Sequence, residues 1–358
     1  MKRSGFVILI ILALTTQGCA DSQGSAKEES GDAIQIIHRE DKKRVDVYID
    51  NAHFTSYLFS EEGSELKKPI LYPLNSARGV NIARRWPFEK QAGERVDHPH
   101  HAGHWLNYGD VNGLDFWNHS TNTPEDRLKR MGSIVHRNVI STESGANSGH
   151  FDVEMDWLRP DGSVILTEQT RFKFTKAPDL RIIDRSTTLT APNGEVSFTD
   201  NKEGMIAIRV TRALEHAEDK PVLLSNENGD PAAEKVINNE GVTGEYLSES
   251  GITGKAVWGT RSPWMILSGT VDNENVSVVI IDHPENPGYP TYWHARGYGL
   301  FSANPLGQKV FSKGAEELNL KLAEGESTTF NYRIALLSSP DDARAKVVEL
   351  ASSFAAMK

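Results

Sequence analysis

The stretches SVILTEQTRFKF, residues 163–174, and DLRIIDRSTTLT, residues 179–190, decide the fold class. In both, apolar residues alternate with polar or charged ones, which is the pattern of a strand with one buried face. The turn sequences Pro160-Asp161-Gly162 and Pro192-Asn193-Gly194 lie before and after this region. The region is therefore predicted to be β-structure.

The same alternation recurs along most of the chain, with turn sequences such as Asp50-Asn51 between the apolar runs. Many short strands with this punctuation predict an all-β protein, a large antiparallel sandwich or barrel. The further segments are AIQIIHR (33–39), RVDVYID (44–50), HFTSYLF (53–59), HFDVEMDWL (150–158), VSFTD (196–200), MIAIRVT (205–211), WMILSGTV (264–271), VSVVIID (276–282) and STTFNYRIALL (327–337).

One helix is predicted at the C-terminus. Ser339-Pro340-Asp341-Asp342 supplies an N-cap, a proline at the first helical position and acids in the first turn. One apolar face follows, made of Val347, Val348, Leu350, Ala351 and Phe354. We expect this helix to pack on the edge of the sandwich.

The N-terminus has the pattern of an export signal. Lys2 and Arg3 precede a short apolar run, and Cys19, the only cysteine, follows Gly18. This order resembles a bacterial lipoprotein processing site and predicts lipidation of Cys19 and an anchor in the cell envelope. The predicted organisation is a signal peptide (1–18), a flexible tether (19–32) and one β-sandwich domain (33–358).

Charge and cysteine content narrow the classes of function. The formal net charge is -10, which disfavours nucleic acid as a partner. A single lipidated cysteine leaves no thiol for disulfides, nucleophilic catalysis or metal binding. No G-x-S-x-G motif, P-loop or dinucleotide fingerprint occurs in the sequence.

Four segments break the strand pattern and concentrate polar, aromatic and glycine residues. They are 76–120, 200–209, 258–264 and 282–308, whereas the polar stretch 226–245 is interpreted as a surface excursion. The first segment contains DHPHHAGHW, residues 97–105. In an extended chain, His98, His100 and His104 would share one face, which suits a divalent metal held by His98 and His100. The alternative is that these histidines hydrogen-bond the backbone of a tight loop.

The same segments could instead support acid–base chemistry. His98 and His101, with Glu203 and His294 from other loops, are candidate acids and bases, and a nearby carboxylate such as Asp97 could orient an imidazole. Glu203 could equally form an ion pair with Lys202 or Arg209.

A third interpretation is a sugar-binding wall. Aromatic rings stack on sugar faces, and amide, carboxylate and guanidinium groups bind hydroxyls. The candidates for this role are Trp105, Asn112, Asp115, Trp117, Lys202, Arg209, Trp293, Arg296 and Asn304. Asp115 could instead be a turn residue, and the tryptophans could belong to the core.

Ordered motifs across the chain resemble a family of exported bacterial proteins, DUF6807, also labelled methane oxygenase PmoA-like. The motifs are KPILYPLNSARGVNIAR, DHPHHAGHWLNYGDVNGLDFW, DNKEGMIAIRV and HPENPGYPTYWHARGYGLFSANPLGQ, within about residues 65–335. His104 falls where other members carry an apolar residue. Methane oxidation is rejected, because the membrane subunit of that enzyme needs several apolar spans and this sequence has only its export signal.

The resemblance implies an all-β protein in bacteria that degrade complex carbohydrates, with a fold analogous to the mutarotase-type supersandwich. The first hypothesis is therefore an exported enzyme acting on a sugar by His/Glu acid–base or metal-assisted chemistry, such as an epimerase, lyase or hydrolase. A non-catalytic glycan-binding lipoprotein and a structural component of the envelope are the alternatives.

Overall fold

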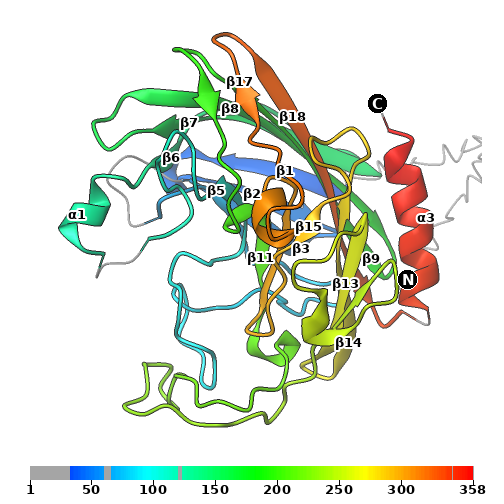
Figure 1. The fold of residues 1–358 in the computed structure, drawn as a ribbon. Helices are drawn as coiled ribbons and strands as arrows, with labels where there is room; N and C mark the ends of the chain where they lie inside the picture. Colours follow the sequence, from blue (N-terminus) through cyan, green and yellow to red (C-terminus); the bar gives the residue numbers. More distant parts are fainter. Residues whose placement is uncertain (1–32, 60–65, 120–122, 341, 358) are drawn as a thin grey trace, which may run out of the picture. The chain divides into compact units, whose positions relative to one another are not determined.

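The computed structural model describes residues 33–59, 66–119, 123–340 and 342–357. Two eight-stranded antiparallel sheets face each other, as Figure 1 shows. The predicted signal peptide, Cys19 and the tether lie outside the described residues.

The first sheet has the strand order β1-β2-β3-β4-β5-β11-β16-β15. Its strands are β1 (Ile34–Arg39), β2 (Arg44–Ile49), β3 (Ala52–Leu58), β4 (Ile70–Tyr72), β5 (His104–Tyr108), β11 (Gly204–Arg209), β16 (Leu300–Asn304) and β15 (Tyr292–Trp293).

The second sheet has the order β12-β13-β14-β18-β9-β8-β7-β6. Its strands are β12 (Glu245–Ser248), β13 (Trp264–Val271), β14 (Glu274–Asp282), β18 (Ser327–Ser338), β9 (Leu180–Thr190), β8 (Val164–Ala177), β7 (Ser148–Leu158) and β6 (Ser133–Glu143). A separate pair joins β10 (Val196–Ser197) to β17 (Lys321–Leu322).

Residues 163–174 and 179–190 lie in adjacent central strands of the second sheet. β8 and β9 pair from Thr167 opposite Thr190 to Ala177 opposite Leu180. Alternate β8 residues such as Leu166, Phe172 and Phe174 are buried in the core between the sheets. The predicted all-β sandwich is confirmed. Short strands such as β5, β15 and β16 were not predicted, because they lie inside the polar and aromatic loop segments.

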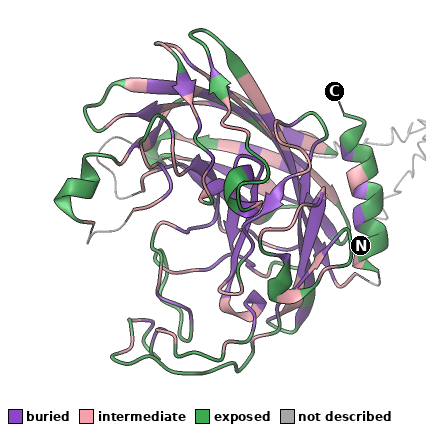
Figure 2. Cartoon of the chain, in the orientation of Figure 1, coloured by how far each residue is buried: buried purple, intermediate pink, exposed green. Residues whose placement is uncertain are grey.

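The C-terminal helix α3 (Ala343–Ala355) covers the outer face of the second sheet. Val347, Leu350 and Phe354 are buried against strands β9, β13, β14 and β18, and Figure 2 shows exposed residues on the other side of the helix. Two details of the prediction were wrong. The helix begins after Asp342, whose side chain caps the amide of Ala345, and Val348 faces solvent, because the buried stripe is narrower than expected.

The remaining helices are single turns. They are η1 (Glu40–Lys42), α1 (Glu125–Leu128), η2 (Arg212–Leu214), η3 (Gly254–Val257) and α2 (Gln308–Phe311). Among the described residues, no helix combines the length and the apolar character needed to cross a membrane.

Candidate functional site

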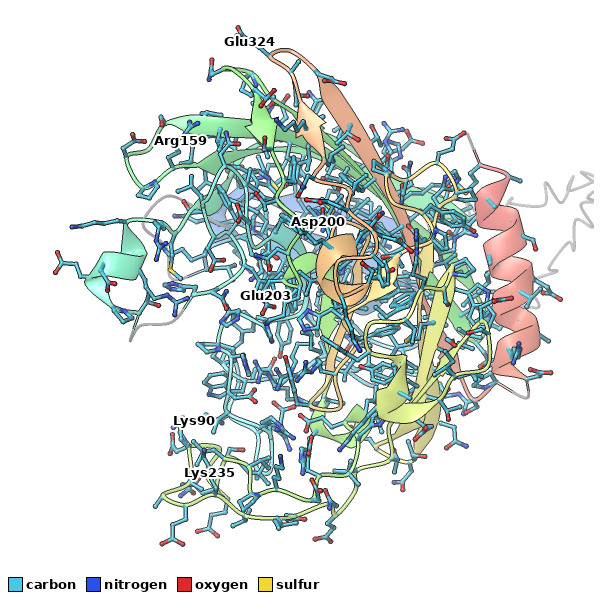
Figure 3. The ribbon with its side chains drawn as sticks, in the orientation of Figure 1. Lys90, Arg159, Asp200, Glu203, Lys235 and Glu324 are labelled. Carbon is cyan, nitrogen blue, oxygen red and sulfur yellow. The ribbon has the colours of Figure 1, made fainter. Side chains whose placement is uncertain are left out.

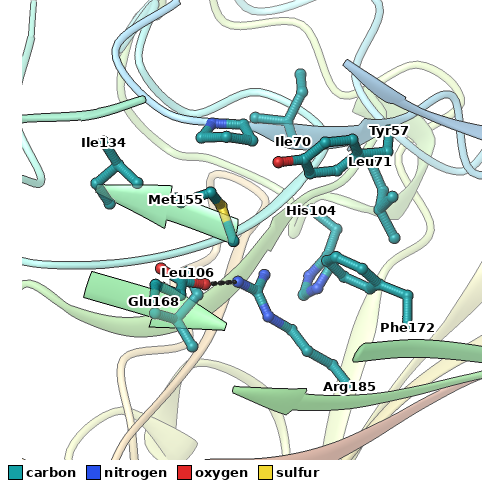
Figure 4. Close-up of a pocket in the computed structure, with 11 residues that line it drawn as sticks. Tyr57, Ile70, Leu71, His104, Leu106, Ile134, Met155, Glu168, Phe172 and Arg185 are labelled. Atoms are coloured by element: carbon teal, nitrogen blue, oxygen red, sulfur yellow. Dashed lines mark hydrogen bonds and ion pairs between the residues drawn. The ribbon is translucent and has the colours of Figure 1, made fainter. Parts of the chain in front are cut away.

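Near its β5-β11-β16-β15 end, the first sheet has an inner face toward the second sheet and an outer face on the opposite side. His104 and Leu106 of β5 point toward the second sheet, where they pack closely beside Glu168 and Arg185 (Figure 4). Arg185 and Glu168 form an ion pair of 3.0 Å there. Residues that alternate with these, such as Trp105, must therefore lie on the opposite, outer face of the sheet.

Strand register places side chains of β5 and β11 on that outer face. Ala207 of β11 lies opposite Trp105 of β5, and Arg209 follows it two positions along. Residues directly opposite in antiparallel strands point to the same side. The 97–103 loop runs over this surface and carries three of the five histidines that the sequence analysis singled out.

The loop is a tight turn and not an extended segment. His98 has φ 45°, and its ring stacks on His101 with centroids 4.9 Å apart and planes 4° apart. Gly103 has φ 58°, and a Cβ at this position would lie 2.3 Å from the carbonyl oxygen of Leu71. The expectation that His98, His100 and His104 share one face was wrong, because the positive φ of His98 breaks the period-two alternation and His104 enters the core.

The loop is held in place by ion pairs and hydrogen bonds of Asp97, Arg84 and Arg209. The Asp97 carboxylate accepts hydrogen bonds from Arg209 at 2.6 Å and from Arg84 at 3.1 Å, and it lies 3.3 Å from Nδ1 of His98. Arg84 also donates to the backbone carbonyls of His98 and His101. Burial acts to raise the pKa of Asp97, but the neighbouring Arg209, His98 and Arg84 outweigh it and hold this pKa below its ordinary value. The loop is thus held by an anion that stays charged.

Glu203 and His294 meet beside the histidine loop. Glu203 Oε2 lies 3.7 Å from Nδ1 of His294, and Glu203 Oε1 also pairs with Lys202. Asn304 donates hydrogen bonds to the carbonyls of Asn201 and Lys202, which fixes the turn that carries Glu203. Burial, aided by the charges of Lys202 and Arg296, lowers the pKa of His294 to about 3, so this imidazole is neutral at pH 7.

Two imidazoles of the 97–103 loop are neutral as well. Burial, with a contribution from Lys68, lowers the pKa of His100 to about 2. Burial and the neighbouring His100 and Arg209 hold the pKa of His101 well below its ordinary value. Neutral imidazoles can both donate and accept hydrogen bonds, as recognition of hydroxyl groups requires.

Aromatic rings surround these polar groups. Trp117 contacts the edge of His101 with centroids 5.5 Å apart and stacks over His294 at 6.3 Å. Tyr298 stacks on His98 at 5.2 Å with the planes 5° apart, and the guanidinium of Arg209 lies 5.0 Å from its ring. Burial raises the pKa of Tyr298 to about 12. Tyr298 also lines an open pocket of about 420 Å³ with Trp258 and Arg296.

The structure therefore brings together eight residues that the sequence analysis named as acid–base or binding candidates. They are His98, His101, Trp117, Lys202, Glu203, Arg209, His294 and Arg296. His98 Nδ1 is engaged by Asp97, and 42% of its side chain is exposed. We call these eight residues, with Asp97 and Tyr298, the histidine cluster.

Four other candidates have structural contacts instead. Trp105 is fully buried and donates to Asn107, and Trp293 is fully buried and donates to the carbonyl of Ser262. Asp115 accepts from the amides of Trp117 and Asn118 and so closes a turn. Asn112 bonds the backbone of Glu195 and Ser197. Asn304, as described above, positions the Glu203 turn.

His98 and His100, the predicted metal ligands, do not lie on one face of an extended segment. The rings of His98 and His100 stand edge to face with centroids 5.7 Å apart, and His100 Nδ1 contacts the carbonyl of His119 at 2.8 Å. Within the part of the chain that the structure describes, no three His, Cys, Asp or Glu side chains are grouped to hold a metal ion. His98 and His100 as metal ligands therefore stay a prediction.

Sequence reasoning did not name Tyr298, Trp258 or Lys68 as site residues. Tyr298 lies in the motif ARGYGLF, only four residues after His294, and its aromatic ring between two glycines was the available signal. Lys68 is buried, donates to the carbonyl of His100 at 2.6 Å and lies over the Trp105 ring, and burial lowers its pKa to about 7. Nothing in the local sequence distinguishes it from a surface lysine.

Comparison with known proteins identifies the family and gives distant structural likenesses. Residues 44–351 match the model of a family of unknown function, DUF6807. No curated protein matches this chain.

Three solved structures illustrate the likeness. Galactose 1-epimerase from Lactobacillus acidophilus NCFM is 10% identical, with 86% of this chain and 98% of that chain covered and a TM-score of 0.34. A putative aldose 1-epimerase from Escherichia coli K12 is 12% identical, with coverages of 86% and 99% and a TM-score of 0.30. A glycoside hydrolase family 97 enzyme variant from Pseudoalteromonas sp. strain K8 is 10% identical, with coverages of 86% and 34% and a TM-score of 0.31. Because each TM-score is below 0.5, the sandwich assignment rests on the two sheets themselves.

Proposed function

This chain belongs to the DUF6807 family, whose function is unknown, and we propose from its own site that it is an acid–base enzyme acting on a carbohydrate. One observation carries the proposal. The Glu203 carboxylate lies 3.7 Å from the buried, neutral His294. Beside them, the exposed His98 stacks on the partly exposed Tyr298, and the buried Trp117 packs against His294. Proton transfer at a sugar carbon requires an acid and a base, and aromatic rings can hold the sugar beside them.

The geometry suggests separate roles for the polar groups. Glu203 is the base, because its second oxygen faces an imidazole while its first is balanced by Lys202. His98 is the candidate acid, because Asp97 engages Nδ1 and leaves Nε2 for a substrate hydroxyl or ring oxygen. His101 and His294 are hydrogen-bonding groups for sugar hydroxyls. Epimerisation, elimination and hydrolysis at a sugar carbon all use such an acid and base.

The test is a substitution at Glu203 combined with a sugar panel. Binding and turnover of mono- and oligosaccharides are followed by NMR, which detects anomeric exchange, new double bonds and cleaved linkages. Glu203→Gln keeps the size of the side chain and removes the charge, so we expect turnover to fall by about 100-fold or more while binding persists. Glu324→Gln removes an equal charge from an exposed site that Figure 3 places far from Glu203 and is the matched control.

Each result of this experiment has a defined meaning. Full turnover by Glu203→Gln would exclude Glu203 as the base. Saturable binding without turnover in the wild-type protein would favour the glycan-binding alternative, in which substitution of Trp117 or Tyr298 weakens binding. Absence of binding to every sugar would contradict the proposal and favour a structural component of the envelope.

A further inference from the structure

The histidine cluster contains three cations, Lys202, Arg209 and Arg296, and two carboxylates, Asp97 and Glu203. Two charged groups flank the cluster, because Arg84 lies 3.1 Å from Asp97 and the buried Glu215 lies 3.9 Å from Arg209. Two carboxylates, Asp97 and Glu203, lie within ion-pair distance of its imidazoles. Both are already paired, Asp97 with Arg84 and Arg209, and Glu203 with Lys202.

Arg296 is the cation of the histidine cluster that is exposed and forms no ion pair with a carboxylate in the described part of the chain. Its guanidinium carbon lies 5.6 Å from the centre of the Trp258 ring and 5.6 Å from the centre of the Tyr298 ring. Contacts with two aromatic faces restrict the side chain and leave its N–H groups available, because ring faces do not use up these donors.

The pocket beside Arg296 has room for a substituent of a bound sugar. Three cations, Lys220, Lys255 and Arg296, and two carboxylates, Glu218 and Asp219, line it, which makes the lining net positive by one charge. Glu218 is 3.5 Å from Lys255 and 3.8 Å from Arg95, so its charge is already balanced. Tyr298 belongs both to this pocket and to the histidine cluster, and it connects the two.

We propose that the substrate is an acidic sugar, whose carboxylate or sulfate oxygens bind the guanidinium of Arg296 while its ring lies over the histidine cluster. This inference rests on the proposed function and specifies the substrate class. A planar guanidinium offers two parallel N–H donors that match the paired oxygens of these groups, and such charge-assisted bonds are among the stronger ones in proteins. A bound anion would also give Arg296 the charged partner that it lacks among the described residues.

Matched pairs of sugars test this inference with the purified protein. Calorimetric titrations would compare glucose with glucuronate, galactose with galacturonate, mannose with mannuronate, and N-acetylglucosamine with its 6-sulfate. Arg296→Gln removes the proposed anion-binding group. Lys235→Gln removes the same charge from the exposed 226–245 excursion, which Figure 3 shows well away from Glu203, and controls for non-specific attraction.

We expect at least one acidic sugar to bind about tenfold or more tightly than its neutral counterpart. Arg296→Gln should remove this preference, and Lys235→Gln should keep it. A preference for the carboxylate or for the sulfate identifies the group recognised. Neutral sugars that bind as tightly as the acidic ones, or a preference that survives in Arg296→Gln, would overturn the inference and leave the proposed function intact. Absence of binding to all eight sugars would count against both.

Discussion

At the residue scale, the candidate site depends on buried polar groups whose protonation is set by their surroundings. Asp97 stays charged because Arg209 and Arg84 donate to it, whereas His100, His101 and His294 stay neutral because burial and nearby cations disfavour the imidazolium form. The site therefore holds neutral imidazoles beside fixed charges at pH 7. It is also a source of sensitivity to acid.

Acidification should therefore destabilise the protein through these imidazoles. The pKa of His100 is about 2 in the folded state and about 6.5 in the unfolded chain, so the unfolded state binds the extra proton first. The stability contributed by the neutral form is fully present above about pH 6.5 and is lost as pH falls, at about 1.4 kcal/mol per pH unit. Between pH 6 and pH 5, the free energy of unfolding of His100→Asn should therefore fall by about 1.4 kcal/mol less than that of the wild type.

Urea denaturation of the wild type and of His100→Asn at several pH values measures this difference. Asparagine keeps an N–H that can reach the carbonyl of His119, which His100 contacts now. Parallel curves for the two proteins over this pH range would show that His100 does not titrate as described.

At the element scale, helix α3 and the histidine cluster lie against different sheets. The second sheet, with α3 on its outer face, is stabilised by a separate apolar cluster that includes Phe354, Trp264 and Ile281. The first sheet presents its outer face at β5, β11, β16 and β15 to the histidine cluster. Changes in the helix should therefore affect stability without changing the site.

Phe354→Ala tests this division. Phe354 is buried, packs edge to face on His283 and has the guanidinium of Arg333 over its ring. Removing it should lower the free energy of unfolding by about 3 kcal/mol, because a cavity replaces the buried ring. Val348→Ala, at an exposed position of the same helix, should change it by less than about 0.5 kcal/mol.

Chemical denaturation measures both variants, and calorimetry measures any sugar affinity they keep. The folded Phe354→Ala protein should bind sugar as the wild type does. Weakened binding in the folded variant would mean that α3 and the site are coupled.

At the scale of the whole molecule, the sequence predicts an exported protein whose domain is tethered to a membrane through Cys19. We expect Cys19→Ser to move the protein from the membrane fraction to the soluble fraction and to abolish incorporation of labelled palmitate in a bacterial host. Equal fractionation of the variant and the wild type, without palmitate in either, would show that Cys19 is not lipidated.

Much of the fold could be predicted from the sequence, because alternation is a local property. Stretches such as 163–174 and 179–190 carry the period of two that a half-buried strand requires, and they became β8 and β9. The start of α3 was placed too early, since Pro340 and Asp342 both suit a helix N-terminus and only the structure shows which residue caps it. β15 and β16 escaped prediction because they are short and lie among glycines and aromatics.

By itself the sequence determined the fold class, the C-terminal helix and the segments that carry the unusual polar residues, since composition and period are local. Tertiary structure alone decided how those residues are combined. It placed Trp105 and Trp293 in the core and His104 beside Arg185, because neighbouring positions on a strand face opposite sides. It also brought Glu203, His294 and Tyr298 to the 97–103 loop, because strand pairing joins segments about 100 residues apart.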